Sequence, residues 1–256
     1  MLLGGLAGLV VLALVGSFAL GRVGVPVPSL PLPLPWAAPA CELRGEDGTV
    51  VLDGSTETMS AAVQRALSDD PVAAKGAAVE QAAAAQEATA QRVRPAADEP
   101  EPESVAAALA AGPAMTCRVG PMRATDTPKQ QPTGLTPAAL QLRKEARAQF
   151  GRLPDGGFGP EEVLPGRRAG GAHSQGRAID FFFRPMDDPE QAEAGWRLAN
   201  WAVANADRLR IRTVIYRDHI WSAWRSAQGW RDYRFAGPDA ENPINRHLDH
   251  VHLDVA

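Results

Sequence analysis

Two short segments, far apart in the chain, carry histidine and aspartate in a pattern that constrains the fold. Residues 171–180 hold His173, Asp180 seven residues later, and Gly176 between them. The second segment is the C-terminal end, where three of the five histidines lie within six residues: His247, His250 and His252. Imidazole and carboxylate groups are common metal ligands, so we expect the chain to fold with these two segments side by side.

The composition limits the class of protein. A chain of 256 residues can hold one sizeable domain with extensions, or two small domains. Charged residues make up 22% of the chain and the formal net charge is −4, so the basic surplus of a nucleic-acid-binding protein is lacking. Five of the six tryptophans follow residue 195, which indicates that the main packed core lies in the C-terminal half.

The N-terminal residues have the composition of a membrane anchor followed by a spacer. Residues 2–20 contain no charge and no proline, and at about 1.5 Å per residue this stretch nearly spans a hydrocarbon core of about 30 Å. We therefore expect an uncleaved transmembrane anchor in residues 1–22. A cleaved signal segment is the alternative, and a buried soluble helix is a third interpretation. Proline at nearly every second position forbids a helix and predicts an extended stalk over residues 23–40.

Residues 41–118 are expected to form a small, alanine-rich helical module without chemistry of its own. Its predicted elements are a strand at 49–53, a helix at 57–67, an alanine-rich helix at 71–92 and a solvated linker at 94–104. A second polar linker, residues 119–134, is predicted to separate this module from the main domain.

The two cysteines, Cys41 and Cys117, are predicted to pair if the chain is exported. Neither has another cysteine or a histidine at metal-ligand spacing, so a zinc ribbon is excluded. A disulfide between them closes a loop of roughly 75 residues and, in the chain-entropy model, stabilises the fold by about 4 kcal/mol. Two free buried thiols are the alternative.

Residues 135–256 are predicted to form the main domain. Thr136-Pro137 and Asp188-Pro189 each place an N-cap residue before a proline at the first helical position. They predict helices that end near residues 150 and 209. Residues 177–183 alternate as a strand that presents Asp180 on one face, beside the small Ala178. Further strands are predicted at 213–216, 220–221 and 251–255.

His173, Asp180 and His252 are the predicted metal ligands. Catalytic zinc takes three protein ligands and leaves a fourth position open, and these residues supply two nitrogens and one oxygen. We assign Asp249 as the general base that accepts a proton from water, and His250, which shares a strand face with His252, as the partner of the developing oxyanion. Since Asp249 precedes His252 by three residues, it reaches the centre only if the strand begins after it. His219 and His247 are predicted to be surface residues.

These residues resemble the motifs of the zinc D-Ala-D-Ala carboxypeptidase, dipeptidase and L-alanyl-D-glutamate endopeptidase family, which shares its fold with the hedgehog signalling domain. The first motif, Ser-x-His-x-x-Gly-x-Ala-x-Asp, is matched from His173 to Asp180, with Gly171 where the family usually has serine. The second, an acid three residues before the last histidine ligand, is matched by Asp249 and His252. The stretch 134–256 also looks like an uncharacterised actinobacterial extracellular domain type.

The resemblance implies an α+β fold, a small antiparallel sheet with flanking helices, and a zinc peptidase that acts on the stem peptides of peptidoglycan. The expected protein is a monomer, held at the cell membrane by its N-terminal segment with the main domain outside the cytoplasm, or else secreted. For the arginine that holds the substrate carboxylate in this family, Arg167, Arg168 and Arg177 are candidates by proximity, and Trp221 is a further candidate for substrate contact. Two alternatives remain: a domain that keeps zinc for binding without catalysis, and a tethered structural protein without stoichiometric zinc.

Overall fold

The computed structural model of the chain describes residues 40–69, 100–120, 122, 131–158 and 171–256. By its internal contacts the chain divides into two compact units, Met1–Ala37 and Ala38–Ala256, and every described residue belongs to the second. Within the described residues, no helix has the length and apolar character needed to cross a membrane. The predicted anchor at 1–22, the stalk up to residue 39 and the predicted helix at 71–92 lie outside these residues.

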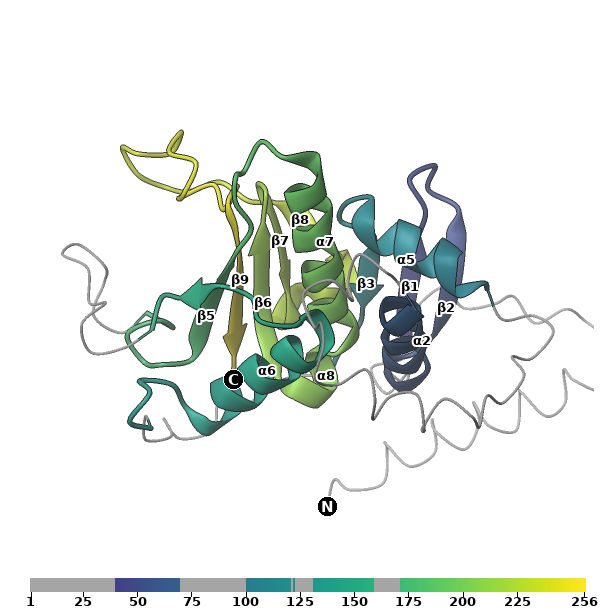
Figure 1. Ribbon diagram of the computed structural model, residues 1–256, viewed down its shortest axis with the longest axis horizontal. Helices are drawn as coiled ribbons and strands as arrows, with labels where there is room; N and C mark the ends of the chain where they lie inside the picture. Colours follow the sequence, from purple (N-terminus) through teal and green to yellow (C-terminus); the bar gives the residue numbers. More distant parts are fainter. Residues whose placement is uncertain (1–39, 70–99, 121, 123–130, 159–170) are drawn as a thin grey trace, which may run out of the picture. The chain divides into compact units, whose positions relative to one another are not determined.

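An antiparallel six-stranded sheet forms the centre of the unit, with its strands in the order β4-β5-β9-β6-β7-β8 (Figure 1). The strands are β4 Asp155–Gly156, β5 Ala178–Phe182, β6 Ile211–Tyr216, β7 His219–Ser222, β8 Arg231–Asp232 and β9 His250–Val255. The C-terminal strand β9 therefore lies between β5 and β6. The predicted combination of helices with an antiparallel sheet is confirmed.

Helices α6 (Pro137–Phe150) and α7 (Pro189–Ala204) pack against one face of this sheet (Figure 1). The alternation predicted for β5 is confirmed, because Ile179 and Phe181 are fully buried in the core while Asp180 lies on the opposite face. The core thus occupies the helix-covered face, and the polar side chains of β5 and β9 stand on the other.

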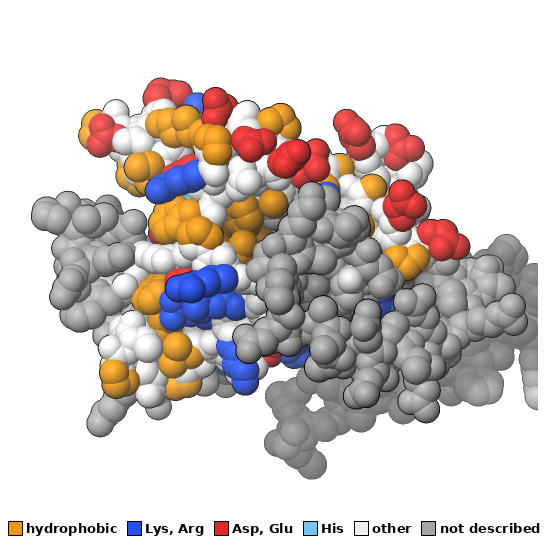
Figure 2. All heavy atoms as spheres, in the orientation of Figure 1, with side chains coloured by type: hydrophobic (Ala, Val, Ile, Leu, Met, Phe, Trp, Pro, Cys, Tyr) orange, Lys and Arg blue, Asp and Glu red, His pale blue; other side chains and the backbone are white. Residues whose placement is uncertain are grey.

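Both predicted helix caps are present. Thr136 Oγ1 accepts a hydrogen bond from the Ala139 backbone N–H at 3.3 Å, and Asp188 Oδ1 accepts one from Glu190 at 2.9 Å. Acidic side chains gather at this N-terminal end of α7 in Figure 2, where they complement the helix dipole. The second helix is shorter than predicted: α7 ends at Ala204, and the short α8 (Ala206–Leu209) begins after Asn205. The break occurs because the Asn205 side chain binds the Trp201 carbonyl at 2.9 Å.

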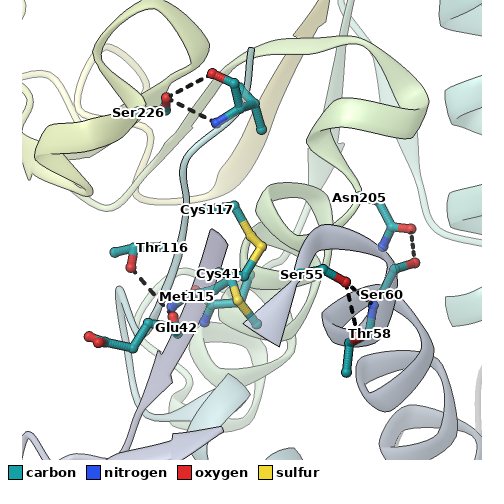
Figure 3. The surroundings of a disulfide bond; sticks show 12 residues. Cys41, Glu42, Ser55, Thr58, Ser60, Met115, Thr116, Cys117, Asn205 and Ser226 are labelled. Atoms are coloured by element: carbon teal, nitrogen blue, oxygen red, sulfur yellow. Dashed lines mark hydrogen bonds between the residues drawn. A yellow bond between two sulfur atoms is a disulfide. The ribbon is translucent and has the colours of Figure 1, made fainter. Parts of the chain in front are cut away.

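A second, three-stranded sheet of order β2-β1-β3 is built from the N-terminal part of the described chain. The elements here are β1 Ala40–Arg44, β2 Val50–Ser55, α2 Thr56–Asp69, α5 Pro102–Ala110 and β3 Met115–Cys117, and the 3₁₀ helix η1 (Ala223–Gln228) lies near β3. The predicted linker at 94–104 is wrong at its end, because residues 102–104 form the first turn of α5, with proline at the helix start. The predicted disulfide between Cys41 and Cys117 is present, and it joins β1 to β3 (Figure 3).

The two sheets share one hydrophobic core through α7. Asn200, fully buried on α7, accepts a hydrogen bond from the Met115 N–H at 3.0 Å and donates to the carbonyls of Leu109 and Gly112 at 2.8 and 2.7 Å. Trp230 Nε1 donates to the Met115 carbonyl at 2.8 Å. The domain boundaries at 41–118 and 135–256 stay predictions, but these buried hydrogen bonds join the two segments within one compact unit.

Candidate metal centre

Asp180 and His252 meet because of the register between β5 and β9. The two residues are directly paired across the antiparallel strands, so their side chains leave the same face of the sheet. His252 Nδ1 lies 3.0 Å from Asp180 Oδ1, and both residues are buried, with 8% and 4% of their surface exposed.

His173 reaches the same point from a tight turn that precedes β5. Gly176, at φ +67°, lets the chain turn back, and its N–H donates to the His173 carbonyl at 2.9 Å. The ring is fixed by Nδ1, which donates to the Gly157 carbonyl at 2.6 Å. Nε2 therefore faces the other two residues, 3.0 Å from His252 Nδ1 and 3.3 Å from Asp180 Oδ1.

His173, Asp180 and His252 form a group that can hold a metal ion, as predicted, since one ligand atom from each lies within 4.8 Å of the others. Their three closest distances, 3.0, 3.0 and 3.3 Å, form a compact triangle. Two ligands of a tetrahedral zinc ion, with bonds of about 2.0–2.2 Å, lie about 3.3 Å apart. The donor set and its spacing thus fit an ion of the size and geometry of zinc, while the identity of the metal is open.

The charges of the three residues support one another. Burial alone would raise the pKa of Asp180, but hydrogen bonds from His173 and His252 outweigh it and hold this pKa well below its usual value. Burial likewise would lower the pKa of His252, yet the hydrogen bond with Asp180 and the nearby charge of Asp254 raise it to about 9. Asp180 is accordingly a carboxylate at neutral pH and is ready to bind a cation.

Asp249 and His250 lie beside this triangle. Strand β9 begins at His250, so Asp249 precedes it, which meets the geometric condition derived from the sequence. Asp249 Oδ1 accepts from His250 Nδ1 at 2.8 Å, and Asp249 Oδ2 accepts from Nε and Nη2 of Arg184 at 2.8 and 2.6 Å. The other nitrogen of His250, Nε2, lies 3.8 Å from Asp180 Oδ1. Asp249 is therefore linked to the ligand group through His250.

The two predicted substrate-contact residues within the described part of the chain, Trp221 and Arg177, are held by contacts of their own. Trp221 is fully buried, because its pairing with Val214 places it on the core face of the sheet, and that prediction is wrong for this structure. Arg177 binds the Val255 carbonyl at 2.7 Å and Gln175 Oε1 at 2.8 Å, so its guanidinium is held by the protein itself. Arg167 and Arg168 lie outside the described residues.

Two histidines that the sequence placed on the surface are partly buried instead. The His247 ring lies 4.7 Å from the ring of His250 and 5.7 Å from that of His252, centroid to centroid. Burial and the neighbouring imidazoles lower the pKa of His247 to about 3, so it is neutral. The His219 ring packs edge-on against Trp196 at 5.5 Å. In the sequence His247 lies within six residues of His250 and His252, and this clustering indicated that it belongs near them.

Other residues of the centre have weaker sequence signals. Gly157 brings its carbonyl to His173, and Arg184 holds Asp249; neither belongs to a recognisable motif. Asp254, two residues after His252 and so on the same strand face, places Oδ2 3.9 Å from His252 Nε2. The sequence indicates this contact only through its spacing, since an acid two residues after a histidine on a strand lies on the same face.

Comparison with known families gives one match: residues 131–244 match the model of a family described as VldE, C-terminal domain. This match includes His173 and Asp180 and ends before β9, so it does not extend to Asp249, His250 or His252. Searches of curated proteins and of solved structures found no match.

Proposed function

We propose that the protein is a zinc-dependent hydrolase of peptide bonds in peptidoglycan. The observation that carries this proposal is the triangle of His173, Asp180 and His252 with a buried Asp249–His250 pair at its side. Three ligands plus an adjacent acid–base pair are what amide hydrolysis at a metal requires. The resemblance of these residues to the motifs of the zinc D-Ala-D-Ala peptidases supports the choice of reaction and substrate.

When bound, zinc would supply a Lewis acid and lower the pKa of water at the open position. The residues of the chain then have separable roles. His173, Asp180 and His252 hold the ion. The Asp249–His250 pair accepts a proton and returns it to the leaving amine. Both oxygens of Asp249 already accept hydrogen bonds, so His250 Nε2 is the atom of the pair that faces the centre. Burial opposes the ionisation of Asp249, but the hydrogen bonds from His250 and Arg184 lower the pKa of Asp249 and keep it ionised.

The proposed setting is outside the cytoplasm, where peptidoglycan lies. The Cys41–Cys117 disulfide supports export, because disulfides persist in oxidising compartments. The apolar composition of residues 2–20 supports attachment to the cell membrane, or secretion if the segment is cleaved. The proposed partner is a peptidoglycan stem peptide, and the proposed state is a monomer.

A second candidate is a zinc domain that binds cell-wall material or a partner without catalysis. One observation favours it: the carboxylate of Asp249 is occupied by Arg184, at 2.8 and 2.6 Å, and is not free to act alone. The two candidates predict the same metal content and differ in the effect of Asp249.

The test begins with metal analysis of the purified full chain after zinc-replete preparation. A structural or catalytic zinc site binds close to one ion per chain. Less than about 0.3 zinc per chain would therefore refute both candidate functions. Digestion of peptidoglycan by the zinc-loaded chain is then followed by mass spectrometry of the released peptides. For the hydrolase, Asp249→Asn and His250→Ala should each lower the rate by about 10²- to 10⁴-fold with zinc still bound. His219→Ala is the control and should leave the rate unchanged. Zinc-loaded protein that releases no peptide favours the binding domain.

A further inference from the structure

A row of five side chains crosses the central sheet from the candidate metal centre to the outer strand β8. Asp180 pairs with His252, and His252 pairs with Ile215 on β6. Ile215 in turn pairs with Ile220 on β7, and Ile220 with Arg231 on β8. Directly paired residues of antiparallel strands point to the same face. The row, which runs across the strands shown side by side in Figure 1, thus begins with two ligand residues and ends with an arginine.

Contacts on both faces agree with this assignment. Arg231 Nη2 donates to the hydroxyl of Ser222 at 2.6 Å, and Ser222 follows Ile220 by two residues, so it shares its face. On the opposite face, Val214 and Trp221 pair with each other and are fully buried in the core. The row therefore lies on the face that the helices α6 and α7 leave uncovered.

Arg231 has an unused capacity to bind an anion. Its Nε is buried and has no hydrogen-bond partner, and its only hydrogen bond within the described part of the chain goes to a neutral hydroxyl. Burial, and after it the charge of Arg225, lower the pKa of Arg231. A buried donor without a partner is unfavourable, and a carboxylate is the group that the guanidinium fork binds best.

Two described arginines near the metal end of the row are already engaged. Arg184 donates through Nε and Nη2 to Asp249, so its charge is neutralised beside the metal centre. Arg177 binds the Val255 carbonyl and lies 3.9 Å from Asp254. Among the described residues of this face, Arg231 is thus a cation without an anionic partner, and it lies at the far end of the row from the metal centre.

We propose that Arg231 binds a carboxylate of an extended peptide that lies across the sheet with its scissile bond at His173, Asp180 and His252. Three strand spacings separate His252 from Arg231, about 14 Å in all. An extended peptide covers this span with about four residues. Ile215, with 8% of its surface exposed, and the half-buried Ile220 lie beneath the intervening part.

This inference deepens the proposed function, on which it rests for the chemistry at the metal end of the row. A carboxypeptidase needs a cation beside the terminal carboxylate, one residue from the scissile bond. A carboxylate held by Arg231 lies about four residues from that bond, so a peptide that reaches Arg231 continues past the cleaved bond. The preferred reaction is the cleavage of an internal bond in a peptide that carries an acidic group at that distance.

The test is a series of peptide hydroxamates, titrated into the zinc-loaded full chain by calorimetry. The hydroxamate binds at the metal, and one glutamate is placed one to six residues away in an otherwise glycine chain. Affinity should peak at a spacing of about four residues, roughly tenfold above the same peptide with glutamine. Arg231→Gln should abolish the peak without lowering the affinity for the peptide that lacks glutamate. Arg234 is an exposed arginine just beyond β8, so Arg234→Gln is the matched control and should keep the peak. The inference is overturned if affinity instead peaks with the glutamate one residue from the hydroxamate and this peak is lost in Arg184→Gln.

A second measurement does not depend on metal or catalysis. The Nε–H signal of Arg231, assigned by its loss in Arg231→Lys, is followed by NMR as a glutamate-containing pentapeptide is added to the metal-free full chain. A saturable shift, absent with the glutamine peptide, is expected. No shift at saturating peptide overturns the carboxylate site whatever the activity. A shift in a protein that neither loads zinc nor cleaves peptide refutes the proposed function and leaves the carboxylate site standing.

Discussion

Asp180 and His252 lie directly opposite each other on β5 and β9, with Asp180 Oδ1 3.0 Å from His252 Nδ1. The core fixes this pairing, because the next pair along the strands, Ile179 and Leu253, is fully buried on the other face. A slip of one residue would place the polar side chains in the core. Hydrophobic packing on one face of the sheet thus sets the geometry of the candidate metal centre on the other.

Gly157 is a position where a single methyl group should damage the centre. A Cβ there would lie 2.7 Å from Asp180 Oδ2 and 2.8 Å from Nδ1 of His173, and the backbone φ is +81°. We expect Gly157→Ala to weaken zinc binding by tenfold or more, as the disturbance of groups that orient metal ligands does. The measurement is the zinc dissociation constant from competition with a chelator.

Gly48 is the matched control for that substitution. Its φ is +80°, nearly the same as that of Gly157, but a Cβ there meets nothing within 4 Å. Gly48→Ala should therefore cost only the backbone strain, about 1 kcal/mol of unfolding free energy, and leave zinc affinity unchanged. Equal zinc affinities for the two variants would show that the space at Gly157 is not needed by the centre.

Local sequence patterns predicted much of this molecule. The caps at Thr136 and Asp188 and the alternation in β5 depend on neighbours within a few residues, and all three are confirmed. The ligand group was predicted from the histidines and aspartates of two short segments, 171–180 and the C-terminal end, and the structure brings His173, Asp180 and His252 together.

The predictions that were wrong mostly concern contacts between segments that are distant in sequence. Trp221 was assigned to substrate contact, but its pairing with Val214 on the neighbouring strand places it in the core. His247 was assigned to the surface, although its ring packs on that of His250, which lies three residues further along the chain. The contact between Gly157 and His173 likewise joins two loops whose approach no local pattern encodes.

Asp254 is expected to raise metal affinity through His252. It lies 3.9 Å from His252 Nε2, and one of its oxygens, Oδ1, is buried without a hydrogen-bond partner. A carboxylate behind a ligating imidazole fixes the orientation of the ring and strengthens its donor nitrogen. Asp254→Asn should weaken zinc binding by about 10- to 100-fold, while Asp232→Asn, on the exposed strand β8, should not change it. An unaltered dissociation constant in a folded Asp254→Asn protein would contradict this role.

The Cys41–Cys117 disulfide should stabilise the fold without affecting the metal centre. The sequence separation is 76 residues, for which the chain-entropy model gives about 4 kcal/mol. Cys41→Ala with Cys117→Ala should lower the unfolding free energy by about this amount, measured with urea, and leave zinc stoichiometry unchanged. Reduction of the unaltered chain should give the same loss. A double variant as stable as the oxidised chain would mean that the disulfide constrains little in the unfolded state.

Tyr216 should make the fold sensitive to alkaline pH. Its side chain is fully buried in the core, with 0% of its surface exposed, and its hydroxyl lies 3.3 Å from the Ala192 carbonyl. Burial raises the pKa of Tyr216 to about 12, whereas the unfolded value is about 10. The neutral phenol is thus favoured in the folded state, so its contribution is complete below pH of about 10 and is lost as pH rises towards about 12.

A shift of this size corresponds to about 2 to 3 kcal/mol of unfolding free energy across that window. Urea unfolding of the full chain at a series of pH values should show this loss, and Tyr216→Phe should remove it while costing about 1 kcal/mol at neutral pH. The chain has two tyrosines, so Tyr216 is the one that remains in the Tyr233→Phe variant. The phenolate absorbance of that variant therefore reports the pKa of Tyr216 directly. The same alkaline loss in wild type and Tyr216→Phe would place its source elsewhere, since the substitution removes the ionisable group and leaves the packed ring.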